Sequence, residues 1–534
     1  MTTRTDKSDN NIALANPAEE LRAKIEFLTQ EIQELYLLDE IPWVLGYSGG
    51  KDSTCILQLV WNAIAQLSEK KRTKTISIIT TDTLVENPIV AAWMRSSIKH
   101  IDKAAKAQKM PIEPHLLHPE ATETFWTGLI GKGYPPPKGK FRWCTERLKI
   151  KPSNHFIRNV IRQHGETILI LGIRKAESNA RAARMNKWEK NKVRDRLVPN
   201  MYLPNSLVYS PVEDWSTNEV WMYLMQWNNP WGHSNKDLFT MYRGATADNE
   251  CPLVVDTTTP SCGNSRFGCW VCTLVSQDKS LNAMVQNDEE KEWLQPLLDI
   301  RRDLDVENNR DRRDFRRRSG NVQLYERNLD GAVSIEPIPG PFTKEARENW
   351  LRKLLIAEIE LRENAPTEFK DITLITPEEL SEIRHIWLEE RHEFDDSLPK
   401  IYEEVTGEVF QDMRKEANEN KILGEDEWEV LQEVCDDDVM HLELMTKLLD
   451  TERQFYTKSR RVGIYESLSK CFDSSSRSQD EAIEKAHQKR DIMSAAIDGD
   501  VKLVKEKIAQ LNKKEAKPTQ QLTWGSIKFG NKEE

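Results

Sequence analysis

Ser-Gly-Gly-Lys-Asp-Ser-Thr, residues 48–54, joins a short apolar run to a segment with helical spacing. The run before it, Pro-Trp-Val-Leu-Gly-Tyr at 42–47, predicts a buried strand. Apolar residues then recur at helical intervals from 53 to 67. A loop of small residues between a strand and a helix lets backbone N–H groups turn toward an anion at the positive end of the helix. The stretch therefore predicts a phosphate-binding loop.

The residue types in this loop suit an anion. Gly49 and Gly50 allow close approach to the backbone, and Lys51 supplies a positive charge. Asp52 fits two roles equally well, as a ligand of Mg²⁺ or as a cap of the helix. The predicted nucleotide site also includes the hydroxyl-bearing members of the loop, which are Ser48, Ser53 and Thr54. The Walker A spacing is absent, so transfer of a terminal phosphate has no support. The remaining alternative is a turn that only connects strand to helix.

Strand and helix patterns alternate beyond the loop. Apolar runs lie at 75–80, 112–117 and 167–172, and the stretches 87–109 and 151–164 can hold helices between them. Such alternation is typical of an α/β fold with a doubly wound parallel sheet. The chain divides into four predicted units: an N-terminal tail and helix (1–40, with the helix at 17–38), the α/β domain (41–249), a cysteine-rich loop (250–277) and a charged, mostly helical region (278–534).

Several polar residues follow predicted strands. Arg174 comes directly after the run at 167–172, and the carboxyl ends of parallel strands form the ligand crevice of such folds. We therefore expect Arg174 to contact a phosphate or sulfate. Asp82 is a weaker candidate of the same kind, and Gly172 belongs to the same predicted site. Glu177 and Arg181 stand four residues apart, which favours an ordinary ion pair on a helix.

Three cysteines lie close together in the sequence, at Cys262, Cys269 and Cys272. The Cys-x-x-Cys pair places two thiolates on one turn, so these three residues are predicted metal ligands. A fourth ligand is needed, and of the two candidates, Cys144 and Cys251, we favour Cys144. Spacing alone fits tetrahedral zinc and an iron–sulfur cluster equally well. A redox-active pair of thioredoxin type would require a preceding strand in a βαβ unit. We predict that the remaining thiols are ordinary core or helix residues; they are Cys55, Cys435 and Cys471.

Composition excludes some classes of protein. The 534 residues carry a formal net charge of −11, which argues against unaided, nonspecific binding to a nucleic acid backbone. No run approaches the roughly 20 apolar residues needed to span a membrane. Residues 1–20 are polar and lack the order of a secretory signal, so we expect a cytoplasmic protein with reduced thiols.

Two local stretches are basic although the chain as a whole has a negative net charge. Each could contact DNA, clamp ATP or form a solvated face. The segment 310–318 is rich in Arg but interleaved with Asp, so we predict a solvated helix there rather than a DNA site. The first stretch comprises Lys132, Lys138, Lys140, Arg142, Arg147, Lys149 and Lys151, and the second comprises Arg174, Lys175, Arg181, Arg184, Lys187, Lys190 and Lys192.

Three further motifs resemble the PAPS reductase family. They are Trp-Cys-Thr at 143–145 followed by Arg147, Leu148 and Lys149, Leu-Gly-Ile-Arg-Lys-Ala-Glu-Ser at 171–178, and Ser-Pro-Val-Glu-Asp-Trp at 210–215. With the loop at 48–54 and the Cys-Gly-Asn-Ser-Arg-Phe-Gly-Cys-Trp-Val-Cys stretch, residues ~40–275 resemble the DndC family, the sulfurtransferases of bacterial DNA phosphorothioation. The resemblance covers about half of the chain.

This resemblance implies an adenine nucleotide alpha hydrolase-like fold and a PP-loop that holds the pyrophosphate end of ATP during transfer of AMP. It also implies a [4Fe-4S] cluster, Mg²⁺, and replacement of a non-bridging oxygen of DNA by sulfur. Lys51, Asp52 and Arg174 are then the expected catalytic residues. The implied partners are DNA, a cysteine desulfurase as sulfur donor and other proteins of the DNA phosphorothioation complex, and no membrane is implied.

Other functions share these motifs. A tRNA thiolation enzyme would use the same loop and cluster. A reductase of adenylylated sulfate would need a cysteine near its C-terminus, but no cysteine follows Cys471. A non-enzymatic scaffold would make the C-terminal region the working part, although the intact loop argues against it. We expect residues 278–534 to dock partners.

Overall fold

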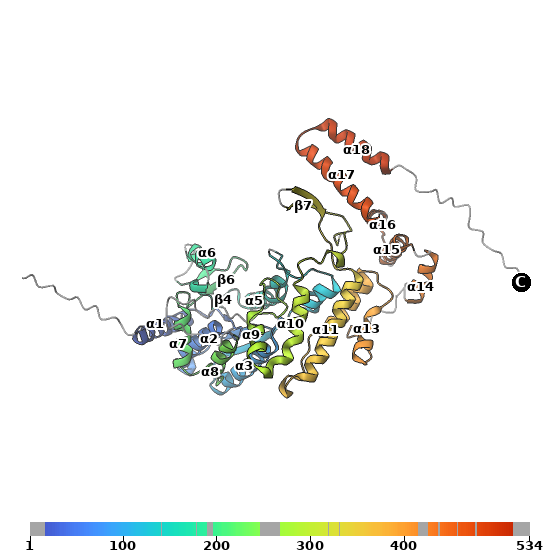
Figure 1. Cartoon of the computed structure of the whole chain (residues 1–534). Helices are drawn as coiled ribbons and strands as arrows, with labels where there is room; N and C mark the ends of the chain where they lie inside the picture. Colours follow the sequence, from blue (N-terminus) through green and yellow to red (C-terminus); the bar gives the residue numbers. More distant parts are fainter. Residues whose placement is uncertain are drawn as a thin grey trace, which may run out of the picture.

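The computed structural model describes residues 17–139, 141–177, 179–189, 196–245, 268–318, 320–329, 332–414, 425–435, 438–456, 458–475 and 478–515. A mostly parallel sheet forms the N-terminal half, and helices dominate the C-terminal half (Figure 1). None of the described helices has the length and apolar character needed to cross a bilayer.

The main sheet has six strands in the order β3-β2-β1-β4-β6-β5. Five run parallel, and β5 pairs antiparallel with β6 at the edge. The chain order reverses between β1 and β4, so a ligand crevice is expected at the carboxyl ends of those two strands. The strands are β1 (Trp43–Gly46), β2 (Ile76–Thr81), β3 (Ile112–Leu117), β4 (Thr167–Ile170), β5 (Val198–Pro199) and β6 (Ser206–Tyr209).

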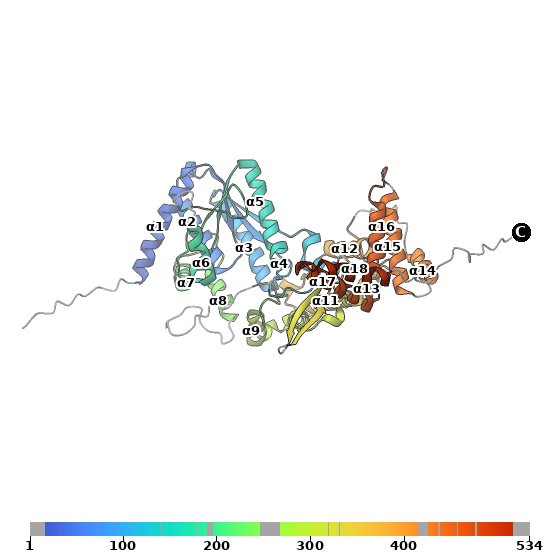
Figure 2. The ribbon, with the colours of Figure 1, turned by 90° about the horizontal axis from the view of Figure 1, so that it is seen from above.

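Helices cover both faces of this sheet, as the sequence predicts for a doubly wound fold (Figure 2). One face buries a large core with residues from α1, α2, α3, α7 and α8. The other face packs a smaller core against α5, which contributes Ile157. The helices of this half are α1 (Pro17–Leu38), α2 (Lys51–Ala65), α3 (Pro88–Ala107), α4 (Trp143–Thr145), α5 (Lys151–His164), α6 (Asn179–Glu189), α7 (Thr217–Gln226) and α8 (Asn235–Gly244).

The strongly periodic segments agree with their predictions. α1 and α5 have the predicted bounds, because their apolar stripes and their ends are local features of the sequence. The α5 helix ends at Gly165, whose φ of +84° suits a residue without a side chain. The hairpin of β5 and β6 has no counterpart among the predicted strands, because runs of two and four residues are too short to show periodicity.

The C-terminal half does not form an isolated unit. Its helices between residues 279 and 406 share one core with the segment 125–148 of the N-terminal half. Trp387 shows this contact, since its indole Nε1 donates to the carbonyl of Ile130 at 3.0 Å. The helices are α9 (Lys279–Asn287), α10 (Gln295–Leu304), α11 (Lys344–Asn364), α12 (Pro377–His385), α13 (Ser397–Thr406), α14 (Glu425–Val434), α15 (Val439–Tyr456), α16 (Ile464–Ser475), α17 (Gln479–Ile497) and α18 (Val501–Glu515).

Two features of this half differ from the expectations. An antiparallel hairpin of β7 (Leu324–Leu329) and β8 (Ala332–Pro337) interrupts the helices. The segment 310–318 is not the predicted solvated helix, because only Arg310–Arg312 form a 3₁₀ turn. Arg316 beyond it pairs with Glu443 of α15 at 2.8 Å, so tertiary ion pairs override the local pattern.

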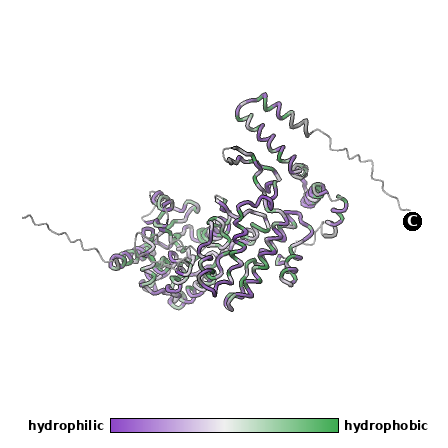
Figure 3. Tube along the Cα trace, viewed as in Figure 1, coloured by the Kyte–Doolittle hydropathy of each residue, from purple (hydrophilic) through white to green (hydrophobic). Residues whose placement is uncertain are grey.

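The last two helices, α17 and α18, form a hairpin beyond the rest of the molecule (Figure 1). Hydrophilic and hydrophobic residues are interspersed along both helices (Figure 3). Two apolar side chains near the turn of this hairpin are largely exposed, Ile497 by 80% and Val501 by 64%.

Candidate nucleotide and cysteine site

The loop at 48–54 lies at the reversal point of the sheet, between β1 and α2. Gly49 has a φ of +72°, which a residue with a side chain rarely adopts. Gly50 is the N-cap of α2 and makes no side-chain cap. The Ser53 hydroxyl donates to the Gly50 carbonyl at 3.0 Å and accepts from the backbone N–H of Ser48 at 3.2 Å. The loop is therefore a closed turn at the N-terminus of a 15-residue helix, which is a suitable place for an anion.

Gly172 lets the end of β4 approach this helix. A Cβ at this position would lie 3.1 Å from the carbonyl carbon of Asp52 and 3.2 Å from the backbone nitrogen of Ser53. Both distances are shorter than an ordinary van der Waals contact. The sequence predicts that Gly172 belongs to the nucleotide site. In the structure, a glycine is needed there because the backbone at the end of β4 packs closely against the backbone at the start of α2.

The Arg174 side chain is buried and paired with Asp52 rather than open to solvent. Its side chain is 2% exposed, and its Nε donates to Asp52 Oδ1 at 2.7 Å. Its Nη1 also donates to the carbonyl of Trp215 at 3.1 Å. The other oxygen of Asp52 pairs with Lys51 Nζ at 3.2 Å. Asp52 therefore pairs with two cations, Lys51 and Arg174. Gly50, and not Asp52, occupies the N-cap position of α2.

Tyr242 is a site residue that the sequence did not reveal. Its hydroxyl accepts from the backbone N–H of Lys51 at 3.3 Å, and its ring centroid lies 5.4 Å from Lys51 Nζ. A Cβ on Gly50 would lie 3.1 Å from this hydroxyl. Burial raises the pKa of Tyr242, so the phenol stays protonated and can donate to an anion. No local signal marks this tyrosine, because it lies 191 residues from the loop in the sequence.

Asp82 follows β2 and holds the neighbouring loop. The carboxylate is buried, accepts from the backbone N–H of Leu84 at 3.0 Å and pairs with Arg95 at 2.8 Å. Trp93 links the same helix, α3, to the phosphate loop, because its indole Nε1 donates to the Gly49 carbonyl at 3.2 Å. Asp82 thus lies at the edge of the predicted site, with its carboxylate engaged in structural contacts.

The Cys-x-x-Cys pair forms a tight turn against the loop after β2. The backbone N–H of Cys272 donates to the Cys269 carbonyl at 3.0 Å, and that of Trp270 donates to Val85 at 3.0 Å. Trp270 is buried beneath the turn. Arg301 of α10 supports it from the other side, since its Nη2 donates to the Cys272 carbonyl at 2.9 Å. The turn is therefore anchored by two separate elements, the loop after β2 and α10.

Cys144, on α4, lies within electrostatic reach of this turn. Burial raises the pKa of Cys144, and the Cys272 thiol raises it further. Burial also raises the pKa of Cys269 to about 11, with a smaller contribution from Cys144. The Lys149 ammonium acts in the opposite direction on Cys269. Three predicted ligands therefore gather beside one cation, a donor set that suits a thiolate-bound metal or cluster.

These contacts do not amount to a formed metal site. Within the described ranges, no group of three or more His, Cys, Asp or Glu residues is arranged to hold a metal ion. Cys262 and the alternative fourth ligand Cys251 lie outside the described residues. The choice between Cys144 and Cys251, and between zinc and iron, stays a prediction.

Most of the predicted basic residues have partners in the described chain. Arg147 and Lys151 both pair with Glu123, at 3.2 and 3.0 Å. Lys175 pairs with Asp214 at 2.9 Å, and Arg181 pairs with Glu177 as the four-residue spacing predicts. The members that lie outside the described side chains are Lys140, Arg184, Lys190 and Lys192. The two stretches are therefore ion-pair networks as much as cationic surfaces.

Comparison with known proteins finds a family match within the N-terminal half. Residues 42–274 match the model of the phosphoadenosine phosphosulfate reductase domain. The chain therefore contains a domain of this PP-loop class. An uncharacterised protein of Methanocaldococcus jannaschii is 26% identical over 200 residues, which is 38% of this chain and 35% of that protein. The chain thus spans about a third of this curated relative.

Solved structures show only a distant likeness. The FMN adenylyltransferase of Candida glabrata with FAD and pyrophosphate is 10% identical, with a TM-score of 0.26 over 44% of this chain and 65% of that chain. The U34-tRNA thiolase of Methanococcus maripaludis with its [4Fe-4S] cluster is 14% identical, with a TM-score of 0.24 over 54% of this chain and 82% of that one. TM-scores this low carry no argument about function.

Proposed function

We propose that this protein is an ATP-dependent sulfurtransferase of DNA phosphorothioate modification. The observation that carries the proposal is the position of the cysteine turn beside the phosphate loop. Both lie at the carboxyl edge of one sheet, with the loop after β1 and the turn against the segment after β2. Such an arrangement suits an enzyme that activates an oxygen with ATP and then replaces it with sulfur.

Activation is needed because a phosphodiester oxygen is a poor leaving group. A non-bridging oxygen of DNA attacks the α-phosphorus of ATP, and pyrophosphate leaves toward the loop at 48–54. A hydrosulfide equivalent then attacks the DNA phosphorus, and AMP departs with the original oxygen. The adduct loses one proton and becomes the phosphorothioate. Every oxygen and sulfur atom is accounted for, and no electrons are exchanged in these two steps.

The protein's own residues favour the first step electrostatically. Backbone N–H groups at the start of α2, the Lys51 ammonium and the Tyr242 hydroxyl all face the place where pyrophosphate gathers charge. Asp52 and Arg174 hold Lys51 in position. Mg²⁺ would neutralise part of the phosphate charge. Asp52 would serve as its ligand only by giving up its pairing with Lys51 or Arg174.

The predicted [4Fe-4S] cluster would be held by Cys144, Cys262, Cys269 and Cys272. When bound, such a cluster can accept a sulfur atom or an electron. The Cys144 thiol raises the pKa of Cys269, and the Cys272 thiol raises the pKa of Cys144, so the described thiols lie within electrostatic reach of one another. A cysteine desulfurase is the proposed sulfur donor, and the other phosphorothioation proteins are proposed to dock on residues 278–534.

The test is transfer of labelled sulfur. The full chain is incubated with ATP, Mg²⁺, a cysteine desulfurase, ³⁵S-cysteine and a thiol reductant, with either DNA or tRNA as acceptor. The thiol supplies the two electrons that release the persulfide sulfur of the desulfurase as hydrosulfide. Label in DNA that withstands removal of protein supports the proposal, whereas label in tRNA alone assigns the chain to tRNA thiolation. Lys51→Ala should abolish transfer, and Lys279→Ala on α9 is the matched control that should not.

A separate measurement tests the cofactor. Iron, acid-labile sulfide and zinc are determined on anaerobically purified parent protein, Cys144→Ser and Cys251→Ser, with Cys471→Ser as a control. About four irons per chain that are lost with Cys144→Ser support the cluster. Stoichiometric zinc in a colourless protein would instead assign a structural metal and remove the sulfur-transfer argument.

A further inference from the structure

A large cavity lies on the β4–β6 side of the phosphate loop. Its volume is about 1010 Å³, and its walls come from α1, α5, α6 and the strands β4, β5 and β6. Ligand pockets commonly measure roughly 300–1,000 Å³, so the space can hold a group as large as a nucleotide. None of the residues 48–54 lines it. The cavity is therefore separate from the loop that would hold pyrophosphate.

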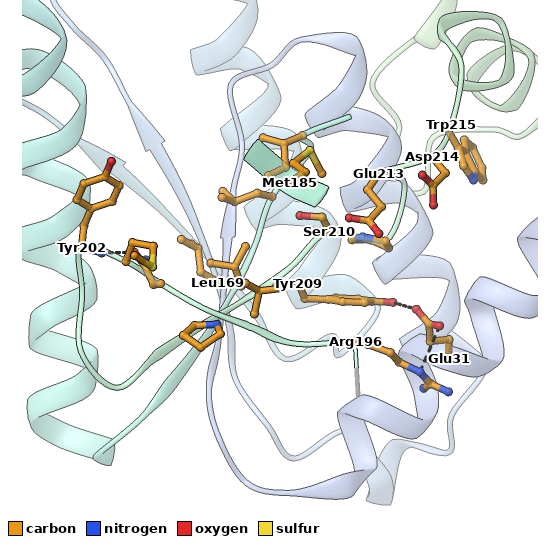
Figure 4. A pocket seen from close by; sticks show the side chains of 18 of the residues that line it. Glu31, Leu169, Met185, Arg196, Tyr202, Tyr209, Ser210, Glu213, Asp214 and Trp215 are labelled. Carbon is orange, nitrogen blue, oxygen red and sulfur yellow. Dashed lines mark hydrogen bonds and ion pairs between the residues drawn. The ribbon is translucent and has the colours of Figure 1, made fainter. Parts of the chain in front are cut away.

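The lining of the cavity is largely apolar. Figure 4 shows the ring of Tyr209 lying across the cavity, with Met185 and Ser210 on the other side of the open space. Leu169 of β4 closes one end. The Tyr209 hydroxyl donates to Glu31 at 2.5 Å, which fixes the ring plane. The Tyr209 ring is only 2% exposed and forms part of the wall, so a planar ligand would stack on the more exposed rings at the mouth.

One basic side chain lies at the mouth of the cavity, among acidic residues that are mostly paired. Three of the four acidic residues of the wall are paired, Glu31 with Arg196 at 3.3 Å and both Glu213 and Asp214 with Lys175, at 3.5 and 2.9 Å. The fourth, Glu146, is exposed and forms no ion pair in the described chain. Arg158 lines the mouth from α5 and is exposed. Within the part of the chain that the structure describes, no carboxylate pairs with it. One cation is thus available to a phosphate group.

The mouth also carries apolar surface that a soluble protein normally covers. Tyr202 is 81% exposed, Met201 67% and Phe27 61%, and all three line the cavity. Exposed aromatic rings beside a basic residue are the usual means of binding single-stranded nucleic acid, since bases stack on the rings while the backbone follows the charge.

The cavity adjoins both parts of the proposed active site. Ile173, on its wall, immediately precedes Arg174, which pairs with Asp52 under the phosphate loop. Glu146 and Ile150, on another wall, belong to the turn that follows Cys144. The cavity therefore shares two short chain segments with the proposed active site, although neither the phosphate loop nor a cysteine lines it.

We propose that this cavity binds an unstacked nucleobase of the DNA strand whose phosphate is modified. The inference rests on the proposed function and specifies how the DNA is held. The rim tyrosine Tyr202 stacks on the base, and Arg158 contacts the backbone. Extruding a base costs a few kcal/mol in a duplex and little in a single strand, so single-stranded or distorted DNA is the preferred ligand.

Binding of labelled DNA tests this directly. The probe is a fluorescein-labelled single-stranded DNA of about 12 nucleotides, within the usual site size for single-strand binding. Its affinity for the full chain is measured by anisotropy. Tyr202→Ala should weaken binding roughly tenfold, which equals about 1.4 kcal/mol and lies within the range for one stacked base. The control Tyr465→Ala, at an 87% exposed tyrosine of α16, should bind like the parent.

A salt titration separates backbone contact from base contact. Arg158→Ala should lower the slope of log affinity against log salt by about 0.7, the value for one phosphate of a single strand. Arg162→Ala, one turn further along α5, is the matched control and should leave the slope unchanged. Fluorescence of 2-aminopurine placed at each position should change at one position and revert in Tyr202→Ala.

The outcomes distinguish this inference from the proposed function. If the parent transfers sulfur to DNA but Tyr202→Ala and Arg158→Ala bind DNA as the parent does, the cavity is not the base site and the proposed function stands. If DNA neither binds the parent nor accepts sulfur, both fail. If an RNA of the same sequence binds at least tenfold more tightly than DNA, the cavity serves RNA and the inference is overturned.

Discussion

Gly172→Ala tests whether the end of β4 positions the phosphate loop. The new Cβ would lie 3.1 Å from the carbonyl carbon of Asp52 and 3.2 Å from the nitrogen of Ser53. These distances are about 0.3–0.5 Å shorter than an optimal contact, and neither neighbour is a flexible side chain. The loop or the start of α2 must therefore move by a few tenths of an ångström.

The expected cost has two parts. Overpacking in a tight site costs about 1–3 kcal/mol, and the loss of chain entropy in the unfolded state returns about 0.4–1 kcal/mol, so the variant should be less stable by ~1–2 kcal/mol. A misplacement of about 1 Å can lower the rate a hundredfold, so a shift of a few tenths should lower kcat/KM for pyrophosphate release several-fold to tenfold.

Urea unfolding and pyrophosphate release are measured on the same preparations. The control is Gly244→Ala at the end of α8, where an added Cβ meets nothing within 4 Å. That variant should keep the parental stability to within about 1 kcal/mol, since alanine is the better helix former. If Gly172→Ala matches the parent in both stability and pyrophosphate release, the packing argument for this glycine is refuted.

Three further predictions concern single contacts. Tyr242→Phe removes only the hydroxyl that meets Lys51, so KM for ATP in pyrophosphate release should rise several-fold at unchanged melting temperature, and a parental KM would contradict this role. Gly128→Ala places a Cβ 2.7 Å from the ring of Trp143, so the neighbouring thiol should shift and the iron content per chain should fall. Burial lowers the pKa of His233 to about 4, below its unfolded value near 6.5, so folding requires the neutral ring. Stability is then complete above pH 6.5 and falls by at most about 2 kcal/mol by pH 5, a loss that His233→Gln should reduce in urea unfolding at the two pH values.

Local patterns predicted much of the fold. The bounds of α1 and α5 follow from apolar spacing and end signals within each segment, and Gly165 ends α5 where the pattern stops. The hairpin β7–β8 shows the limit of this reasoning, because its antiparallel pairing depends on contacts between residues such as Tyr325 and Glu336 rather than on periodicity.

The candidate site was likewise predictable from the sequence only in part. The phosphate loop was found from sequence because a strand, small residues and a helix stand next to one another at 43–65, and each leaves a local signature. The pairing of Arg174 with Asp52, and the hydroxyl of Tyr242 on the loop, join residues more than 100 positions apart. No pattern within one segment can indicate contacts between residues so far apart in the sequence.

The sequence by itself determined which chemistry-bearing groups the chain has and where the nucleotide loop and the Cys-x-x-Cys turn lie along it. Only the tertiary structure decided that Arg174 is engaged with Asp52, that Arg301 supports the cysteine turn, and that a cavity lined by Tyr209 lies between α1, α5 and the strands β4 to β6. The physical reason is that hydrogen-bond periodicity and capping act over a few residues, whereas burial and ion pairing depend on which distant segments the folded sheet brings together.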